Sequence, residues 1–346
     1  CLHGMFQFAG ASRTQRWAGR LVQLQNLARG GNTTKDPATL AEVMISGGHD
    51  AVKALYGNCM GALSDTIRSA ITAPEGKILN VADLSSIESR VLGWIADCSK
   101  INDTFARGLD TYKVFACDMY NVEYDDVTKE QRTFSKPPVL GGGYGLGWKG
   151  LIGYADGMGV TMSQIEAQNA IDVFRDRYYE VPELWNWCTD AVFYTTRTGN
   201  ECQGKHGLRT YAHGEFLFLG LPSGRSIAYH RPAIELREAP WGDMIDNFTF
   251  MGIDQYTQKW TRIAAHGGKL VENIVQAVAR DILCIWLDRA EVAGFYTVGH
   301  VHDEVICVEN GDRLEELCEL IRQPIDWAPG LLLDADGYTA RRYRKD

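Results

Sequence analysis

Several features that would assign a protein class at once are missing from this 346-residue sequence. It contains no run of ~20 apolar residues, the length that a membrane-spanning helix needs. It has no GxxxxGK[ST] motif, which excludes a P-loop nucleotide site. Its nine cysteines never occur as CxxC, and Cys284 and Cys307 stand in apolar runs. We therefore expect reduced thiols inside a cell, with neither a disulfide framework nor a zinc site.

Charge is unevenly distributed along the chain. The formal net charge of −9 argues against a polyanionic partner such as nucleic acid. However, basic residues gather near the two ends: Arg13, Arg16, Arg20, Arg29 and Lys35 at the start, and Arg341, Arg342, Arg344 and Lys345 at the end. Such patches can bind phosphates on an acidic protein, or they are ordinary solvated surface. The net charge leaves both interpretations open.

The composition is typical of a globular protein. With 45% hydrophobic and 23% charged residues, the chain can bury a sizeable core as one large or two interleaved domains. The first residue is Cys1 and not Met, so we expect a fragment or a processed product. Simple truncation and protein splicing, which leaves a Cys, Ser or Thr at its junction, are the two alternatives.

One segment combines a buried strand with two acids. Ile78–Ala82 is an almost continuous apolar run, typical of a strand buried on both faces, and it stops at Asp83. Ser85 or Ser86 is expected to cap the helix that follows, which carries Glu88 in its first turn. This arrangement predicts a metal or phosphate site or, more simply, a helix cap.

Periodicity and turn residues predict further elements. Helices are expected over residues 37–72 with breaks at 47–48 and 57–58, over 110–120, over 164–195 with an interruption at Pro182, and over 268–292. Two hairpins are expected, one over 216–229 and one over 295–310 with its turn at His302 and Asp303. The first 31 residues are expected to form loops and short strands.

A capping box introduces a helix with a row of functional side chains. Thr128–Gln131 matches that box, and Arg132, Lys136 and Leu140 follow at steps of four, close to one face. The two prolines after Lys136 each remove a backbone donor and should bend or end the helix there. The direction in which Leu140 points is therefore left open.

Acids, bases and glycines together point to one kind of chemistry. Asp83 at a strand end and Asp303 at a hairpin tip suit two Mg²⁺ ions, because hard cations take oxygen ligands and keep positions open for phosphates. Arg132 and Lys136 would neutralise a triphosphate. The glycine-rich run around Tyr144 would let a backbone approach a flat substrate closely. The combination predicts phosphoryl or nucleotidyl transfer.

These residues resemble the motifs of the family A DNA polymerases, the family of bacterial DNA polymerase I. Three motifs carry the resemblance: Asp83 to Glu88 with Arg90; Arg132, Lys136, Gly141, Tyr144 and Gly145 with Leu140 where Phe or Tyr is usual; and His302, Asp303 and Glu304. The resemblance covers nearly the whole chain and is closer to phage members. It implies template-dependent addition of deoxynucleotides to a primer 3′-hydroxyl, in the cytoplasm, which is the host's if the source is a virus.

The resemblance implies roles for the charged residues. Asp83 and Asp303 would bind two Mg²⁺ ions, for which Mn²⁺ can substitute. The Leu84 carbonyl would assist them, and Glu304 would have a supporting catalytic role. Two further residues, Arg132 and Lys136, would hold the triphosphate, and Lys136 would also protonate the leaving pyrophosphate.

It also implies sugar and DNA contacts. Glu88, Tyr144 and Leu140 would shape the sugar pocket, and Tyr112 stands where many members have a phosphate-binding His. The implied DNA contacts are Arg16, Gln23, Gln25, Asn26, Asn273, Gln276, Arg280 and His302.

The implied fold is α+β, a right-hand polymerase. Its palm, an antiparallel sheet with helices, would carry both aspartates, and a mostly helical fingers subdomain would be inserted into it. Residues 1–96 would form the first part of the palm, 97–230 the fingers and 231–346 the second part of the palm. The thumb is expected to be absent and to lie, with any exonuclease, on an upstream segment or a separate chain. The implied partners are a DNA primer-template and deoxynucleoside triphosphates, and no membrane.

Two alternatives stay open. A single-subunit RNA polymerase of the phage type shares the paired aspartates and the Lys/Tyr helix, but has a small residue where Glu88 stands. The other alternative is a non-catalytic DNA-binding piece that is inactive without a missing half. Primer extension with Mg²⁺ and either deoxy- or ribonucleotides separates these possibilities.

Overall fold

The computed structural model describes residues 4–28, 36–238, 242–254 and 257–344. Four residues noted in the sequence, Cys1, Arg29, Lys35 and Lys345, lie outside the described residues. The chain divides into two compact units. Unit 1 comprises Cys1–Ser85, Ile282–Gln323 and Leu333–Asp346, and unit 2 comprises Ser86–Asp281 and Pro324–Leu332. The predicted subdomain boundaries at residues 96 and 230 stay predictions.

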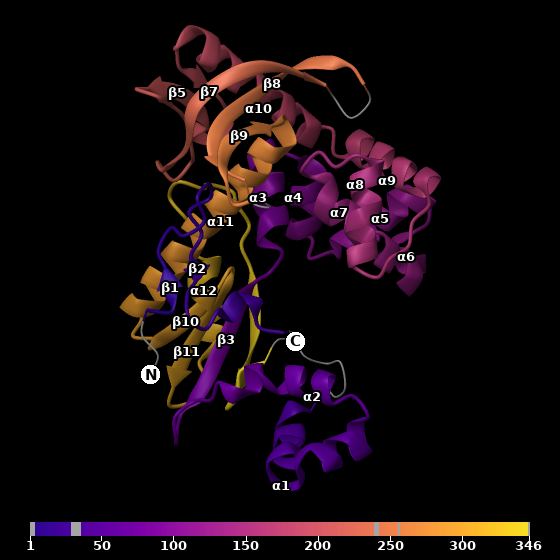
Figure 1. Cartoon of the computed structure of the whole chain (residues 1–346), viewed down its shortest axis with the longest axis vertical. Helices are drawn as coiled ribbons and strands as arrows, with labels where there is room; N and C mark the ends of the chain where they lie inside the picture. Colours follow the sequence, from indigo (N-terminus) through magenta and orange to yellow (C-terminus); the bar gives the residue numbers. More distant parts are fainter. Residues whose placement is uncertain (1–3, 29–35, 239–241, 255–256, 345–346) are drawn as a thin grey trace. The chain divides into compact units, whose positions relative to one another are not determined.

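A four-stranded antiparallel sheet forms the centre of unit 1 (Figure 1). In spatial order its strands are β10 (Thr297–Val301), β11 (Glu304–Glu309), β3 (Ile78–Leu84) and β12 (Ala335–Ala340). β3 has a partner on each side, and most of its residues are buried, as its apolar run predicts. The predicted strand and the hairpin of β10 and β11 are confirmed. The strand differs from the prediction only in continuing one residue beyond Asp83.

A helix and a cluster of buried side chains pack against this sheet. α12 (Leu314–Arg322) packs against β3 and β12. One core cluster includes Leu79 and Val81 of β3 together with Ile306 of β11 and Tyr343 near the chain end. Because residues two apart on a strand share a face, Asp83 continues the row of Leu79 and Val81 at the strand end.

The N-terminal part of unit 1 adds to this core. The short strands β1 (Phe6–Gln7) and β2 (Ala18–Gly19) pair with each other, and Leu24 enters the cluster of Leu79 and Val81. α1 (Pro37–Tyr56) and α2 (Cys59–Thr66) have a small core of their own. The predicted breaks are confirmed, because Gly48 interrupts α1 with a φ of 63° and Gly57 ends it.

Unit 2 begins with a helical region. Its helices are α3 (Ile87–Ala96), α4 (Ser99–Ala106), α5 (Thr111–Tyr120), α6 (Lys129–Phe134), α7 (Lys136–Gly142), α8 (Trp148–Gly157), α9 (Gln164–Arg177) and α10 (Glu180–Thr198). The capping box at Thr128 is present at the start of α6. The predicted break near Lys136 is confirmed, because the prolines occupy the first turn of α7, where amide donors have no helical partner.

The predicted serine cap of α3 is confirmed in its position but wrong in its side-chain hydrogen bond. Ser86 is the N-cap residue, but its side chain makes no capping hydrogen bond and its φ is 52°. A capping serine normally has extended φ/ψ, which aims its hydroxyl at the amides of the first turn. The left-handed backbone of Ser86 turns the side chain elsewhere.

An antiparallel six-stranded sheet follows in unit 2 (Figure 1). Its strands are, in spatial order, β4 (Cys202–Gln203), β5 (Arg209–His213), β6 (Phe216–Gly220), β7 (Ser226–Glu238), β8 (Met244–Ile253) and β9 (Trp260–Ala265). The predicted hairpin over 216–229 is its central pair, β6 and β7. The predicted long helix is α11 (Gly267–Val292), whose residues belong to both units. None of the helices in the described ranges is long and apolar enough to cross a membrane.

Candidate active site

Acids from distant parts of the sequence meet at one end of the sheet in unit 1. The register of β3 and β11 places Glu304 directly opposite Asp83. One residue further on, the Leu84 amide donates to the carbonyl oxygen of Asp303 at 2.9 Å. Asp83 and Asp303 are both half-buried, so their carboxylates keep access to water. The strand pairing therefore brings the first and third predicted motifs together.

The backbone is unusual beside both aspartates. His302 has a φ of 52° and begins the two-residue turn between β10 and β11. Ser86, three residues after Asp83, also has a φ of 52°. A left-handed conformation costs a non-glycine residue roughly 1–2 kcal/mol, and such outliers concentrate at functional sites. The fold thus holds two strained turns beside the paired acids.

A further acid, which the sequence did not indicate, lies next to Asp83. Asp336 on β12 is the register partner of Asp83 on the side away from β11. It is exposed, and one of its carboxylate oxygens accepts a hydrogen bond from the Gly337 amide at 2.7 Å. In the sequence it stands in a DADG stretch, which is typical of a turn. Only the strand register shows that it flanks Asp83.

The donor set at this strand end suits a hard divalent cation. Among the described residues there is no group of three or more His, Cys, Asp or Glu side chains arranged to hold a metal ion. The site instead offers the carboxylates of Asp83 and Asp303 from neighbouring strands. Mg²⁺ is usually bound by one or two carboxylates and keeps its other positions for water and substrate phosphates. The residues present therefore fit Mg²⁺ better than zinc.

A second group of predicted residues lies in unit 2. Arg132 Nε donates to Asp110 Oδ2 at 2.6 Å, and its guanidinium lies 5.3 Å from the centre of the Tyr112 ring. Lys136 Nζ lies 5.9 Å from the same ring centre. Burial, followed by the nearby Asp110 charge, raises the pKa of the Tyr112 phenol. Tyr112 therefore stays neutral and contacts both predicted phosphate-binding cations.

Asp110 is a residue that the sequence could have revealed. It is the N-cap of α5 and accepts hydrogen bonds from the amides of Tyr112 and Lys113, at 2.9 and 3.2 Å. An Asp immediately before a helical pattern is an ordinary start signal. Its second oxygen holds Arg132. One carboxylate thus fixes both a helix end and the orientation of a predicted triphosphate ligand.

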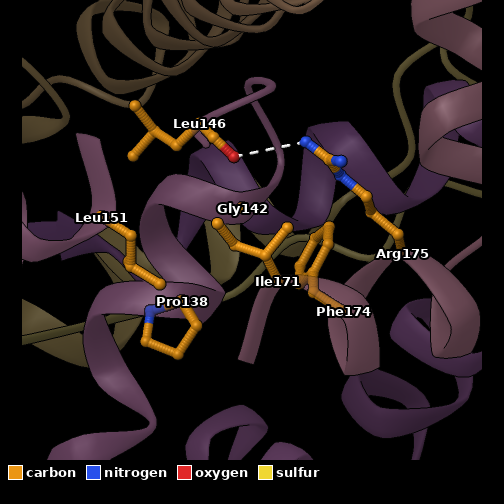
Figure 2. Close-up of a pocket in the computed structure, with 7 residues that line it drawn as sticks. All are labelled: Pro138, Gly142, Leu146, Leu151, Ile171, Phe174 and Arg175. Atoms are coloured by element: carbon orange, nitrogen blue, oxygen red, sulfur yellow. Dashed lines mark hydrogen bonds between the residues drawn. The ribbon is translucent and has the colours of Figure 1, made fainter. Parts of the chain in front are cut away.

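The glycines at the end of α7 and directly after it have a packing reason. A Cβ on Gly142 would lie 2.9 Å from the Phe174 ring, and one on Gly143 would lie 2.4 Å from a Leu92 methyl group. Figure 2 shows the apolar crevice where Gly142 faces α9 residues Ile171 and Phe174. The predicted close approach of a substrate at this glycine run stays a prediction. In the structure these glycines let α7 approach neighbouring side chains.

Two of the residues predicted to shape the sugar pocket, Glu88 and Tyr144, contact each other. The Tyr144 hydroxyl donates to Glu88 Oε2 at 3.4 Å, and both residues are half-buried. Gly268 allows the close approach of the Tyr144 backbone, because a Cβ there would lie 2.3 Å from the Tyr144 carbonyl oxygen. Leu140 is half-buried at the fifth position of α7. These residues all belong to unit 2.

The predicted DNA-contact residues have different surroundings. Asn273 and Arg280 are buried, and the Asn273 amide donates to the Tyr229 hydroxyl at 3.1 Å. Gln276 is half-buried. Five of the predicted DNA-contact residues lie in unit 1. The exposed ones are Gln23, Asn26 and His302, and the half-buried ones are Arg16 and Gln25. Of these three polar side chains of α11, two are therefore buried and one is half-buried.

Comparison with known proteins gives consistent results. Residues 58–213 match the sequence model of DNA polymerase family A. The whole chain is 36% identical, over 349 aligned residues, to a DNA polymerase of Bacillus phage SP02, of which it covers 53%. A 112-residue part, 32% of the chain, is 36% identical to 12% of DNA polymerase I of Pseudomonas aeruginosa.

The fold leads to the same group of proteins. The structure matches the POL domain of Pol1 from M. smegmatis, described in complex with DNA primer-template and dNTP, with a TM-score of 0.60 and 20% sequence identity. That match covers 98% of this chain and 47% of the other, and it supports the predicted α+β polymerase fold. The chain spans about half the length of both the phage polymerase and the solved structure. By its sequence motifs, its relatives and its fold, the chain belongs to DNA polymerase family A.

Proposed function

We propose that this chain is the catalytic part of a DNA-directed DNA polymerase. The observation that carries the proposal is the pairing of β3 with β11, which brings Asp83 of the first motif beside Asp303 and Glu304 of the third. Family membership supports the same chemistry, template-dependent transfer of a deoxynucleotide to a primer 3′-hydroxyl. The solved relative with DNA primer-template and dNTP supports the same substrates here.

Asp83 and Asp303 are the proposed ligands of two Mg²⁺ ions, which Mn²⁺ can replace. Such a pair of ions supplies activation of the attacking hydroxyl and stabilisation of the leaving oxygen. The Leu84 carbonyl is a third donor, because paired residues of an antiparallel ladder point both their N–H and C=O groups at the same neighbour. Since the Leu84 amide donates to the Asp303 carbonyl, the Leu84 carbonyl also faces the neighbouring strand segment at Asp303.

Arg132 and Lys136 are the proposed triphosphate ligands. Arg132 is held by Asp110 and the Tyr112 ring, so it is oriented before nucleotide binds. Preorganisation of this kind reduces the side-chain entropy lost on binding. Lys136 is the proposed acid that protonates the leaving pyrophosphate. Tyr112 stands where many family members have a phosphate-binding His. Its neutral ring contacts Arg132 and Lys136 and does not itself bind phosphate as a cation.

Sugar selection is assigned to Glu88 and Tyr144, with Leu140 nearby in sequence. Their contact at 3.4 Å supports exclusion of a 2′-hydroxyl and disfavours the RNA polymerase alternative, which needs a small residue at position 88. DNA contacts are assigned to Arg16, Gln23, Gln25, Asn26, Asn273, Gln276, Arg280 and His302.

The proposed organisation follows the family. Residues 1–96 and 231–346 form the palm, and residues 97–230 form the fingers. A thumb, and any exonuclease, is assigned to an upstream segment or a partner chain, because this chain covers 53% of its phage relative. We place the enzyme in the cytoplasm of the cell in which it replicates DNA.

Primer extension tests the proposal directly. The chain is incubated with a saturating primer-template, Mg²⁺ or Mn²⁺, and one nucleotide at a time. We expect addition of the nucleotide complementary to the template base, with deoxynucleotides strongly preferred over ribonucleotides. A primer without a template strand is the control and should not be extended. Extension that ignores the template base, or no extension with either metal ion, would contradict the proposal.

A further inference from the structure

Three buried polar residues of unit 1 form a chain of hydrogen bonds that ends beside the candidate metal site. The Tyr343 hydroxyl donates to Glu304 Oε1 at 2.5 Å, and Arg68 Nη1 donates to the Tyr343 oxygen at 3.1 Å. The exposed fractions are 5% for Arg68, 0% for Tyr343 and 2% for Glu304. A buried carboxylate is tolerated only where hydrogen bonds and an opposite charge compensate it. Here the phenol supplies the bond and Arg68 supplies the charge.

Arg68 is fixed at the far end of this chain. Besides Tyr343, it donates from Nε to the Ala28 carbonyl at 2.7 Å and from Nη2 to the Leu27 carbonyl at 2.6 Å. All three guanidinium nitrogens therefore have acceptors. Because the guanidinium is planar, it cannot turn away from the phenol without breaking several of these bonds. Arg68 orients the Tyr343 hydroxyl toward Glu304.

Tyr343 is held by its backbone as well. Its amide donates to the Ile71 carbonyl at 2.9 Å, and the Ala73 amide donates to the Arg341 carbonyl at 2.9 Å. Thr72 and Arg342 form an antiparallel bridge between these two bonds. The segment 341–343 is thus attached to the residues that lead into β3. This paired stretch of backbone holds the Tyr343 phenol beside Glu304.

Glu304 lies next to both proposed metal ligands. It is directly opposite Asp83 on the neighbouring strand and adjacent to Asp303 in sequence. We propose that Tyr343, supported by Arg68, is a positioning residue that keeps Glu304 inside the buried network, so that the paired aspartates alone supply carboxylates to the metals. This inference rests on the proposed polymerase function and assigns Glu304 a structural role in place of the supporting catalytic role that the resemblance implies.

Metal binding without nucleotide tests the proposal. Tyr343→Phe keeps the buried ring and removes the hydroxyl, and Mn²⁺ binding is measured by electron paramagnetic resonance. Without the hydrogen bond from Tyr343, the Glu304 carboxylate should add a ligand opposite Asp83 and tighten the apparent Kd for Mn²⁺ by roughly threefold to tenfold. Adding Glu304→Gln to Tyr343→Phe should restore the wild-type Kd. Tyr338→Phe is the matched control, since this hydroxyl contacts the backbone of Arg344 and should leave the Kd unchanged.

The alternatives give different results. An unchanged Mn²⁺ Kd in Tyr343→Phe, whatever the change in melting temperature, would mean that Tyr343 is structural only and would overturn the proposal. If that variant does not fold, Glu304→Gln alone decides, because a Kd about tenfold weaker than wild type would make Glu304 a ligand after all. Asp83→Asn reports on the proposed function separately. If it binds Mn²⁺ as tightly as wild type, the metal assignment itself is wrong.

Discussion

Replacing Glu88 by alanine tests how the nucleotide sugar is selected. The Glu88 carboxylate and the Tyr144 phenol contact each other at 3.4 Å, and both side chains are half-buried. The proposal is that they occupy the space that a 2′-hydroxyl needs. Glu88→Ala removes that volume and also the acceptor of the Tyr144 hydroxyl. It should therefore admit ribonucleotides while leaving the metal ligands in place.

The distance decides which part of the pair dominates selection. O–H···O hydrogen bonds are normally about 2.7–2.8 Å long, so a contact at 3.4 Å is weak. Tyr144→Phe should consequently change the sugar preference by no more than about threefold, or ~0.6 kcal/mol. Forcing a 2′-hydroxyl against the carboxylate leaves a polar group without a partner, at a cost of ~1–3 kcal/mol. Glu88→Ala should thus relax selection by roughly one to two orders of magnitude, since ~1.4 kcal/mol is tenfold.

Single-nucleotide primer extension measures the effect. The ratio of kcat/KM for a deoxynucleotide to that for its ribonucleotide is determined for wild type, Glu88→Ala, Glu88→Gln and Tyr144→Phe. Glu88→Gln keeps the volume and should retain most of the selection. If Glu88→Ala abolishes use of both nucleotides equally, Glu88 acts with the metal ligands and the reasoning is refuted. An equal effect of Tyr144→Phe would show that the hydrogen bond, and not the volume, selects the sugar.

Three further outcomes are expected. Leu140→Tyr should increase use of dideoxynucleotides in primer extension, because leucine offers no hydroxyl to replace the missing 3′ group; an unchanged ratio would mean that α7 points Leu140 elsewhere. Tyr112→Ala should raise the KM for nucleotide more than it lowers kcat, because it removes the ring that contacts both cations, whereas an altered kcat alone would place Tyr112 in the chemical step. Burial, followed by the His302 charge, lowers the pKa of His300 to about 4. The unfolded state therefore binds a proton more readily than the folded state. The free energy of unfolding should fall by about 3 kcal/mol as the pH drops from about 6.5 to about 4. Urea melts should show that His300→Phe reduces this loss and that His49→Asn, at an exposed position, does not; equal pH dependence in all three proteins would disprove the assignment.

Local sequence patterns were sufficient to predict features that depend on the residues of one helix or strand alone. The apolar run before Asp83 predicted a buried strand, because a strand paired on both sides needs apolar residues on both faces. Thr128 predicted the start of α6 through its capping box. The prolines after Lys136 predicted a break, because they lack the donors that a continuous helix requires. Each of these conclusions depends on chemistry within a few residues.

Other features depend on pairing between distant segments. Nothing in the sequence around Asp336 indicates that it flanks Asp83, since only the register of β12 with β3 brings them together. Asn273 and Arg280 are polar residues of α11, yet both are buried, and the Asn273 side chain contacts the Tyr229 hydroxyl of β7. Nothing in the sequence around Gly142 indicates that the Phe174 ring leaves little room there for a Cβ. Tertiary packing, which a local pattern does not contain, decides these positions.

The chain of Arg68, Tyr343 and Glu304 is a still stronger case. Its members are separated by as many as 275 residues in sequence, between Arg68 and Tyr343. Each residue alone is unremarkable, and an isolated Tyr near a basic chain end gives no reason to link it to a catalytic motif. Their common burial and mutual hydrogen bonds become apparent only in the folded sheet.

Single-turnover primer extension by three asparagine variants tests the paired-aspartate site most directly. Asp83→Asn and Asp303→Asn each remove one anionic oxygen ligand from the proposed metal pair. Asp336→Asn removes the same charge from the other neighbour of Asp83 and is the matched control. We expect nucleotide addition to be abolished in the first two variants, with unchanged melting temperatures, and to remain near wild type in the third. Near-normal extension by Asp83→Asn or Asp303→Asn would contradict the proposed site.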